Sequence, residues 1–257
     1  MPRFISDELF HFVGRKHPKN HEANYLKLKQ VIELSRISHP PHDSDWGATQ
    51  VVANLSKLLE TEELVVPTMT CYCDIPFESL GLHLEKYGCF GISFSKDLLI
   101  KYGARPVIYV PLHPNNWGSP YGRSMLQDIE AVFRGFKSQL LPSIDSSISW
   151  NRIIGVEPES KHEAIVALDS VFTKDFVAFI KPYESQLSDD NPNYYYAERE
   201  WRKFGNLKFE SSNVSRIVVD RTYLKRARND FPEYVDKIYA APMEKNWLFK
   251  LIDRLSS

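Results

Sequence analysis

Residues 193–204 constrain the chain more than any other segment, because three tyrosines, a tryptophan and a phenylalanine stand there among paired charges. Aromatic residues fit a pleated, half-buried surface, so this composition favours a β-strand. Side chains alternate along a strand, and Glu198 and Glu200 would therefore share one face, with their Cα atoms roughly 6.5–7 Å apart. The segment predicts a strand that carries two neighbouring carboxylates.

Two interpretations of this carboxylate pair stay open. On a solvated face, Arg199 and Arg202 would neutralise the glutamates, and exposed ion pairs of this kind contribute little to stability. In a functional site, one glutamate would orient a substrate hydroxyl, while the other would stabilise developing positive charge or accept a proton.

Composition limits the classes of protein to which the chain can belong. Its 257 residues are 43% hydrophobic and 25% charged, which is typical of a soluble globular protein. Lys and Arg number 32 against 33 Asp and Glu, so no global field attracts the chain to nucleic acid or to a membrane. The odd number of cysteines, the lack of a secretory pattern and the lack of an apolar run of roughly 20 residues favour a cytoplasmic protein without membrane contact.

The remaining sequence alternates short β-prone runs with amphipathic helices. Strands are expected at residues 8–14, 65–75, 89–95, 105–111, 207–210, 214–220 and 237–241. Helices are expected at residues 21–37, 49–63, 77–86, 96–102, 125–141, 161–181, 223–235 and 245–255. Since no repeat or linker interrupts this order, we predict a single α+β domain over residues 1–257, with a helical insertion over residues 119–190.

No motif of the common phosphate-binding, hydrolase, metalloprotease or dinucleotide-binding folds occurs in the chain. Cys71, Cys73, Cys89 and His83 have side chains that zinc accepts, but no second close-spaced pair accompanies the first two cysteines. Buried cysteines that pack as small hydrophobic residues explain this pattern better. We therefore expect no metal site at these residues.

Histidines and acids elsewhere allow both structural and functional roles. His11 lies in an apolar strand, where it is either a satisfied core group or a donor to a ligand hydroxyl. In the second case Gly14 would let the ligand approach the backbone. Asp74, between a strand and Pro76, is either a turn acid or a site residue. For the His and Asp side chains of the polar loop at residues 39–45, solvent exposure explains the composition better than metal binding.

A helix late in the chain carries Lys225, Arg226 and Arg228 close to Tyr223 and Phe231. Basic and aromatic side chains in this arrangement can contact phosphate and stack on bases. A solvated helix face explains the same residues and is the simpler interpretation.

Five motifs, taken in order, resemble the AbiGi family of abortive-infection proteins. They are FHF at residues 10–12, CYCDIP at 71–76, YGCFGISFSK at 87–96, GARPVIY at 103–109 and YAEREWR at 196–202. The resemblance covers most of the chain outside the helical insertion. It implies a role in phage resistance, and the family is labelled an antitoxin.

The order of elements is also similar to that of ADP-ribosyltransferases, including DarT-like enzymes that modify nucleic acid. This similarity implies a split β-sheet core with flanking helices, and NAD as the substrate. Carried over to this chain, His11 would hold the nicotinamide ribose and Gly14 would present backbone to the nicotinamide amide. Tyr87 or Phe94 would stack on the nicotinamide ring.

The same similarity assigns catalytic roles to the two glutamates. Glu200 would bind a ribose hydroxyl and stabilise the oxocarbenium ion that forms as nicotinamide leaves. Glu198 would orient the acceptor. Phe12 and Ser93 would complete the set of NAD-binding residues.

We therefore expect a cytoplasmic, NAD-dependent ADP-ribosyltransferase of an antiphage toxin–antitoxin system, acting on a nucleic-acid or protein acceptor. The alternative is a non-enzymatic antitoxin that binds and neutralises a partner toxin. A metal-dependent nuclease that uses the two glutamates and Asp74 is a third hypothesis. A cleft in which His11 and Glu200 converge would favour the enzyme over the binding protein.

Overall fold

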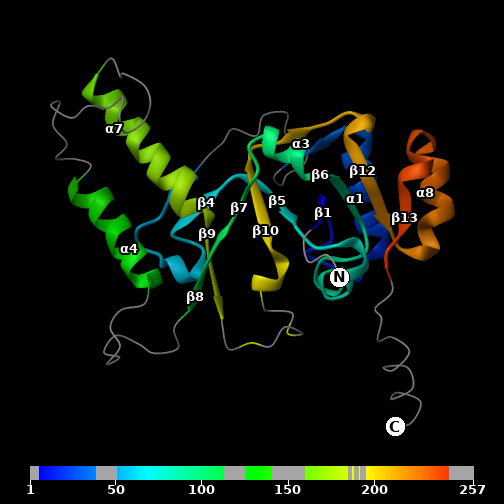
Figure 1. The fold of residues 1–257 in the computed structure, drawn as a ribbon, viewed down its shortest axis with the longest axis horizontal. Helices are drawn as coiled ribbons and strands as arrows, with labels where there is room; N and C mark the ends of the chain where they lie inside the picture. The colour runs from blue at the N-terminus through cyan, green and yellow to red at the C-terminus, as the bar shows by residue number, and fades with distance from the viewer. Residues whose placement is uncertain are drawn as a thin grey trace, which may run out of the picture. The chain divides into compact units, whose positions relative to one another are not determined.

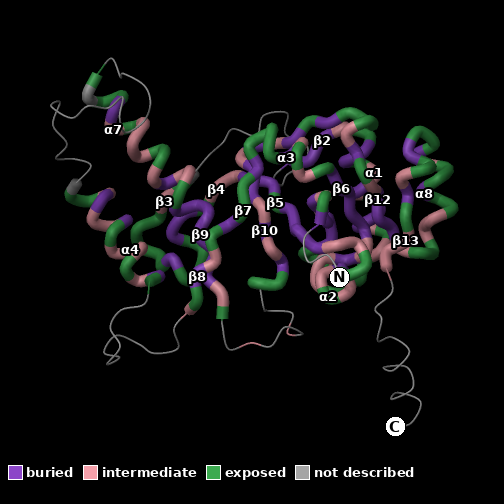
Figure 2. The backbone as a smooth tube through the Cα atoms, in the orientation of Figure 1, coloured by how far each residue is buried: buried purple, intermediate pink, exposed green. Residues whose placement is uncertain are grey.

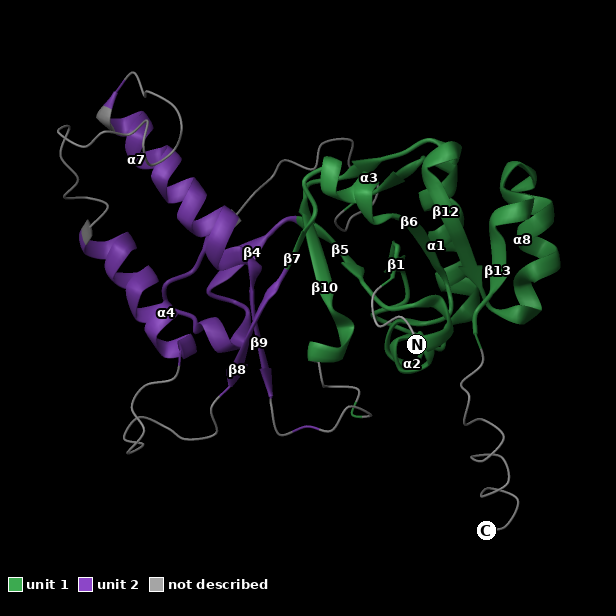
Figure 3. Cartoon of the chain, in the orientation of Figure 1, with its two compact units in different colours: residues 1–47, 69–106, 188–257 green, residues 48–68, 107–187 purple. Residues whose placement is uncertain are grey.

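The computed structural model describes residues 6–38, 51–112, 125–140, 160–184, 187, 191 and 195–242. The chain forms two compact units, coloured separately in Figure 3. Unit 1 comprises Met1–Gly47, Met69–Pro106 and Ser188–Ser257, and unit 2 comprises Ala48–Thr68 and Val107–Leu187. The helical insertion predicted over residues 119–190 overlaps unit 2, and its bounds and the single-domain organisation stay predictions. The helix predicted at residues 245–255 and the polar loop at residues 39–45 lie outside the described residues.

Unit 1 is built on a seven-stranded mixed sheet (Figure 1). The strands lie in the order β13-β12-β6-β1-β5-β10-β7, and every neighbouring pair is antiparallel except β12 with β13. Their bounds are β1 Glu8–Phe12, β5 Met69–Cys73, β6 Gly91–Ser95, β7 Arg105–Pro106, β10 Glu200–Phe204, β12 Val214–Val219 and β13 Ile238–Ala240. The sheet and its helices confirm the predicted α+β class.

Two helices of unit 1, α1 and α3, begin at a side-chain cap. Asn20 Oδ1 accepts a hydrogen bond from Ala23 N at the start of α1, and Ser95 Oγ accepts one from Leu98 N at the start of α3. The helical elements are α1 His21–Glu33, η2 Phe77–Ser79, α2 Gly81–Tyr87, α3 Lys96–Lys101, η7 Ser211–Asn213, η8 Arg221–Tyr223, α8 Leu224–Asp230 and η9 Pro232–Lys237. The helix predicted at residues 21–37 ends early, because Ser35 takes a left-handed φ of 47°. The two residues after it form β2 (Arg36–Ile37), which pairs with β11 (Leu207–Lys208).

Alternating side chains give this sheet two buried faces, which Figure 2 shows in purple. We call the first the α1 face, because helix α1 packs on it. Its core includes Leu9, Tyr25, Leu28, Tyr72, Ile92, Phe94 and Ile217. We call the second the α2 face, because Leu84 of helix α2 packs there. Its core includes Phe10, Phe12, Cys73, Ile75, Leu80 and Val218.

The junction between β1 and β5 is less regular than its neighbours. Phe10 and Cys73 form the one register pair between these strands, whereas β1 with β6 and β10 with β5 each have five. Side chains add links at this junction. His11 Nδ1 lies 2.8 Å from the Cys71 carbonyl oxygen, and Asp74 Oδ1 accepts a hydrogen bond from Ser6 N at 2.9 Å. Buried backbone polar groups need hydrogen-bond partners. These side-chain bonds therefore strengthen the junction of β1 and β5, where few bonds between the two backbones form.

Unit 2 contains two pairs of strands, two long helical segments and one short helical turn in its described part. The strand pairs are β3 (Val51–Ala53) antiparallel to β4 (Val65–Pro67), and β8 (Ile108–Leu112) parallel to β9 (Ile180–Glu184). Helix α4 (Met125–Gly135) continues into the π-helical segment η3 (Phe136–Leu140). Helix α7 (Lys161–Ser170) continues into η4 (Val171–Phe176) and η5 (Val177–Phe179). The helices predicted at residues 125–141 and 161–181 are confirmed, except that β9 takes the last residues of the second.

The helix predicted at residues 49–63 is wrong. Val51–Ala53 pair with β4 instead, and only Leu59–Thr61 form a helical turn, η1. Of the apolar stripe expected to be buried, Leu59 is buried, but Val52, Leu55 and Leu58 are 56%, 40% and 46% exposed. Pairing between strands therefore overrides a local helical pattern here.

Two predicted strands are each divided in the structure. The run at residues 65–75 separates into β4 and β5, and the run at residues 105–111 separates into β7 and β8. Both divisions fall where the chain passes between the two units. Every helix in the described part of the chain is too short or too polar to span a lipid bilayer.

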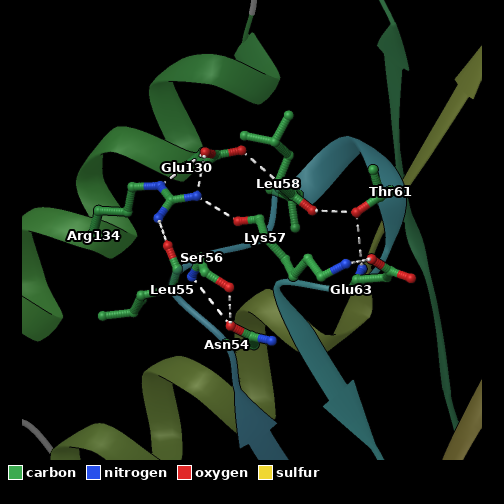
Figure 4. Close-up of polar contacts among 10 residues, drawn as sticks. Asn54, Leu55, Ser56, Lys57, Leu58, Thr61, Glu63, Glu130 and Arg134 are labelled. Carbon is green, nitrogen blue, oxygen red and sulfur yellow. Dashed lines mark hydrogen bonds and ion pairs between the residues drawn. The ribbon is translucent and has the colours of Figure 1, made fainter.

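A polar network fixes the loop after β3 to helix α4 (Figure 4). Arg134 donates hydrogen bonds to the carbonyl oxygens of Leu55 and Lys57, and its Nε donates to Glu130 Oε1 at 2.8 Å. Glu130 Oε2 accepts a hydrogen bond from Leu59 N at 2.8 Å. Two residues one helical turn apart thus satisfy both carbonyl and amide groups of the loop.

Candidate functional site

The two glutamates at residues 198 and 200 do not lie on one strand. Tyr195–Glu198 form a short 3₁₀ turn, η6, and strand β10 begins only at Glu200. Arg199 lies between them with a left-handed φ of 43°. Its N–H donates to Tyr196 O, and its carbonyl oxygen accepts a hydrogen bond from Asp74 N. Tertiary contacts therefore override the β propensity of the tyrosines, and the predicted strand is wrong at residues 195–199.

Glu198 is buried against the end of helix α2. The Lys86 ammonium and the Tyr87 hydroxyl both donate to Glu198 Oε1, at 2.7 Å and 2.8 Å. Glu198 is only 8% exposed, so this ion pair is poorly solvated. The solvated-face interpretation is therefore wrong for Glu198, which a lysine of another element neutralises.

Tyr87 is held as a neutral hydrogen-bond donor. Burial raises the pKa of its hydroxyl well above the usual range, and the charge of Glu198 and the hydrogen bond to it raise this pKa further. The charge of Arg15 acts in the opposite direction, with a smaller effect. The His83 ring stacks on Tyr87 with centroids 4.3 Å apart, and it lies 5.2 Å from the Phe12 ring. Tyr87, which bonds Glu198, is thus the last of three ring side chains that contact one another in sequence.

Glu200 is buried too and has a cation of its own. Arg202 Nε donates to Glu200 Oε1 at 2.7 Å, between side chains two residues apart on one side of β10. Glu200 is 7% exposed, so Arg202 neutralises it inside the protein and not on a solvated face. Glu200 pairs in register with Cys73, whose side chain packs on the α2 face. Glu200 therefore belongs to the α2 face.

His11 belongs to the opposite face of the sheet. Phe10 pairs with Cys73, and Cys73 pairs with Glu200, so the register places these three residues on the α2 face. His11 follows Phe10 and points to the α1 face, where its ring lies 5.8 Å from Tyr72. The structure does not bring His11 and Glu200 together.

The other residues assigned to NAD are divided between the faces in the same way. Phe94 is fully buried on the α1 face, with its ring centroid 5.1 Å from that of Phe209. Its neighbour Ser93 donates a hydrogen bond to Glu8 Oε2 at 2.5 Å. Phe12 lies on the α2 face, and it is joined to Tyr87 through the His83 ring.

Gly14 is required for close packing after β1. A Cβ atom at this position would lie 2.3 Å from Tyr87 O and 2.8 Å from Asn24 Nδ2. The Asn24 amide in turn donates to His17 O at 2.9 Å. The missing side chain of Gly14 therefore lets the loop after β1 approach the end of α2, next to the tyrosine that bonds Glu198.

Asp74 and Lys86 hold this region in place. Asp74 is buried, its Oδ2 accepts a hydrogen bond from Lys96 Nζ at 2.8 Å, and its N–H fastens the Arg199 turn. The sequence left Asp74 open between a turn acid and a site residue, and its hydrogen bonds are those of an anchor for the turn. Lys86 was missed altogether, because a lysine on a short amphipathic helix carries no signal that separates a buried partner from a solvated one.

Metal ligands do not gather in the part of the chain that the structure describes. No group of three or more His, Cys, Asp or Glu side chains there is placed to hold an ion. Burial raises the pKa of the Cys73 thiol, with further increases from Glu198 and Asp74, and burial also raises that of Cys89. Protonated thiols are poor metal ligands. The zinc and nuclease interpretations gain no support from this geometry.

The polar cluster of Lys86, Tyr87, Glu198, Glu200 and Arg202, of which the last three are buried, is called the Glu198 network below. Each of its carboxylates has a cation at 2.7 Å. The cation balances the negative charge of each carboxylate within the protein. A ligand that used either carboxylate would therefore have to draw it away from its cation.

Comparison with protein families gives one match. A family model described as "Putative abortive phage resistance protein AbiGi, antitoxin" matches residues 52–236. The match spans well over half of the chain and includes the whole Glu198 network, whereas β1 with His11 and Gly14 lies outside it. No curated protein and no solved structure matches the chain.

Proposed function

Because the chain belongs to the AbiGi family, we propose that it acts in abortive phage resistance as an antitoxin that binds and neutralises a partner toxin. The family match carries this proposal, since it covers residues 52–236 and bears an antitoxin description. A protein of this kind acts through a stable surface and needs no reactive group.

The Glu198 network supports a binding role. Lys86 and Arg202 each lie 2.7 Å from a buried carboxylate, and removing one member of such a pair is strongly destabilising. These pairs fix the end of α2 and the start of β10 in one arrangement. His11, which a shared catalytic cleft requires beside Glu200, lies on the other face of the sheet.

The antitoxin proposal is tested by growth. The partner toxin, expressed alone, should arrest the host, and co-expression of this chain should restore colony formation. Calorimetry with the two purified proteins should then give a Kd of about micromolar or tighter. A chain that leaves toxin-arrested growth unchanged and gives no heat of binding would contradict the proposal.

One observation favours a second candidate, an NAD-dependent ADP-ribosyltransferase. Glu198 and Glu200 are both buried, at 8% and 7% exposure, and Tyr87 beside them has a strongly raised pKa. Groups of ionisable residues with shifted pKa values are frequent at active sites, although structural ion pairs also produce them.

In this second candidate, the carbon–nitrogen bond between nicotinamide and its ribose breaks, and the electron pair leaves with nicotinamide. The Glu200 carboxylate stabilises the positive charge left on the ribose. An oxygen or nitrogen atom of the acceptor forms the new bond to that carbon, and Glu198 takes the acceptor's proton. Both steps require that the glutamates separate from Lys86 and Arg202.

Label transfer separates the two candidates. Wild-type protein is incubated with labelled NAD and with DNA, RNA or protein acceptors. The transferase predicts label on an acceptor, loss of label with Glu200→Gln, and retention with the control Glu8→Gln. Glu8 suits this control because it is a partly buried carboxylate that also bonds an arginine, Arg216, at 3.0 Å. Absence of both label transfer and NAD consumption by wild type would eliminate the transferase.

A further inference from the structure

Two segments far apart in the sequence concentrate positive charge at one place on unit 1. Residues 15–19 contain one arginine and two lysines, residues 221–229 contain three arginines and one lysine, and neither run includes a carboxylate. The whole chain, by contrast, has a net charge of −1. The charge of these two runs is therefore local and does not reflect a generally basic protein.

The first turn of α1 and the start of α8 hold the two runs side by side. Arg226 Nη1 lies 2.7 Å from Glu22 Oε2, and the Tyr223 hydroxyl donates to the same carboxylate oxygen at 3.0 Å. His21 Nδ1 lies 3.7 Å from Asp220 Oδ2. The loop before α1 and the turn η8 therefore each lie within two residues, along the chain, of a residue that makes one of these contacts.

Arg226 takes part in this packing, so it is less available to a ligand than the neighbouring lysine and arginine side chains are. Its guanidinium lies 4.4 Å from the Tyr25 ring centroid and 5.8 Å from that of Tyr223, in addition to the bond with Glu22. Asp230 is also occupied, because the Tyr25 hydroxyl and Lys29 Nζ donate to it. The nearest acids and one of the arginines are thus paired with each other.

Arg15 is exposed as well, but its charge acts on Tyr87, and the five exposed cations that remain are called the basic surface. They are Lys16, Lys19, Arg221, Lys225 and Arg228. None of the five has an ion pair within the described part of the chain. Three of them recur at i, i+4 and i+7 along η8 and α8, so they lie on one side of this helical segment.

The loop that carries Lys16 and Lys19 is held in one conformation. His17 N donates to Gly14 O and Asn20 N donates to His17 O, each at 3.0 Å. The buried Asn24 amide adds its bond to His17 O. Backbone bonds of this kind limit the ordering entropy that a ligand would otherwise have to offset.

We propose that the basic surface binds the phosphate backbone of a nucleic acid. Unpaired cations that follow two adjacent segments match a chain of phosphates, and binding of this kind needs no base-specific contact. A membrane surface fits less well, because residues 221–229 include no exposed large apolar side chain of the kind that inserts between lipids. This inference is independent of toxin binding and of transferase chemistry.

Salt dependence tests the proposal. Fluorescence anisotropy is measured with a labelled oligonucleotide of about 20 nucleotides, single-stranded or as a duplex, between about 50 and 200 mM salt. With three to five phosphates contacted, the logarithm of the binding constant should fall with the logarithm of salt concentration at a slope of about −2 to −4. Each of the double variants Lys16→Gln/Lys19→Gln and Lys225→Gln/Arg228→Gln should reduce this slope by roughly 1.5 and weaken binding by about tenfold.

The control is Lys101→Gln/Lys208→Gln, which removes two exposed positive charges elsewhere on unit 1. This variant should bind like wild type, and thermal melts should show that all the variants are folded. Equal loss in the control, no binding by wild type at low salt, or tighter binding to vesicles containing phosphatidylserine than to the oligonucleotide would overturn the proposal. The proposal would also be overturned if the two double variants lost affinity for the partner toxin but still bound the oligonucleotide as tightly as wild type.

Discussion

Two carboxylate networks lie on the α2 face of the same sheet, and the backbone that holds them differs. In the first, which we call the Glu8 network, Glu8 accepts bonds from Arg216 Nε at 3.0 Å and Ser93 Oγ at 2.5 Å. The three side chains come from β1, β12 and β6, which pair over several positions. In the Glu198 network the carboxylate comes from a 3₁₀ turn, and a left-handed residue, Arg199, follows it.

The two networks together show which features of a paired carboxylate indicate a functional role. A glutamate with an arginine partner occurs in both networks, so this pairing alone does not distinguish a functional role from a structural one. Backbone strain and a tyrosine with a strongly raised pKa occur together only in the Glu198 network, within the described residues. Strain of this kind concentrates at functional positions. The Glu8 network is therefore the internal control for every experiment on the Glu198 network.

Among the substitutions that test this difference, Gly14→Ala should change the free energy of unfolding most. The new Cβ would lie 2.3 Å from Tyr87 O, a backbone atom, so strand β1 or the end of α2 has to move. We expect a loss of about 3 kcal/mol in the free energy of unfolding, measured by urea denaturation. Gly135→Ala is the control, because no atom lies within 4 Å of its Cβ position, and it should be neutral or stabilising by up to about 1 kcal/mol. Equal effects at the two glycines would contradict the packing argument.

Glu198→Ala should cost more stability than Glu8→Ala. Without Glu198, the Lys86 ammonium and the Tyr87 hydroxyl lose their shared acceptor in a poorly solvated place, for which we expect about 2 kcal/mol. Without Glu8, the Arg216 guanidinium still stacks on two aromatic rings, with centroids at 4.4 and 4.5 Å, so about 1 kcal/mol is expected. Parallel denaturation curves measure the difference, and a larger loss for Glu8→Ala would reverse the ranking.

Alkaline pH should act on Tyr87 through Glu198. The pKa of Tyr87 is raised in the folded state, so the folded protein keeps this proton at pH values where the unfolded chain releases it. Stability is therefore full below the unfolded pKa of about 10 and falls as pH rises above it. Tyr87→Phe should make the decline of stability above pH 10 shallower by about one proton.

Tyr72 provides the matched case for this titration. Burial also raises the pKa of Tyr72, but a hydrogen bond with Thr70 lowers it and no glutamate contributes. Glu198→Gln should therefore lower the pKa of Tyr87 and leave that of Tyr72 unchanged, as followed by tyrosinate absorbance in single Tyr→Phe backgrounds. A shift at both tyrosines would indicate general loosening and not a specific effect of Glu198.

Arg199→Gly should have the smallest effect, and of opposite sign. Glycine adopts a φ of 43° without the steric cost that arginine meets there, so a gain of about 0.5–1 kcal/mol is expected in thermal melts. Ser35→Gly, at a φ of 47° away from both networks, should gain a similar amount. If Arg199→Gly alone lost biological activity while it gained stability, strain at residue 199 would be part of the function.

Local patterns were sufficient to predict much of unit 1. The strands β1 and β12 and the helix α3 form where they are predicted, since each element satisfies its own pattern. Failures arose where a distant partner decided the outcome. Strand β3 forms because β4 pairs with it, and the turn at η6 forms because Lys86 and Tyr87 hold Glu198. Neither partner is visible in the local sequence.

The same reason explains what could be predicted of the candidate site. Glu198 and Glu200 were singled out from their spacing, and both are buried, although the strand that was expected to carry both begins only at Glu200. Arg202 was also expected to neutralise a glutamate, but on a solvated face and not inside the protein, whereas Lys86, which comes from another element, was not expected. The alternation rule, applied with the observed register, separates His11 from Glu200, but that register could not be read from the sequence.

Growth rescue by Glu200→Gln tests most directly whether the chain acts by binding or by carboxylate chemistry. The variant keeps the shape of the side chain and an oxygen that can accept a hydrogen bond from Arg202 Nε, but it removes the charge and should lower stability, so rescue is scored at a temperature at which thermal melts show the variant to be folded. When co-expressed with the partner toxin at that temperature, it should restore colony counts to within about twofold of wild type, with an unchanged Kd for the toxin. Loss of rescue by the folded variant, with toxin binding as tight as that of wild type, would contradict the antitoxin account.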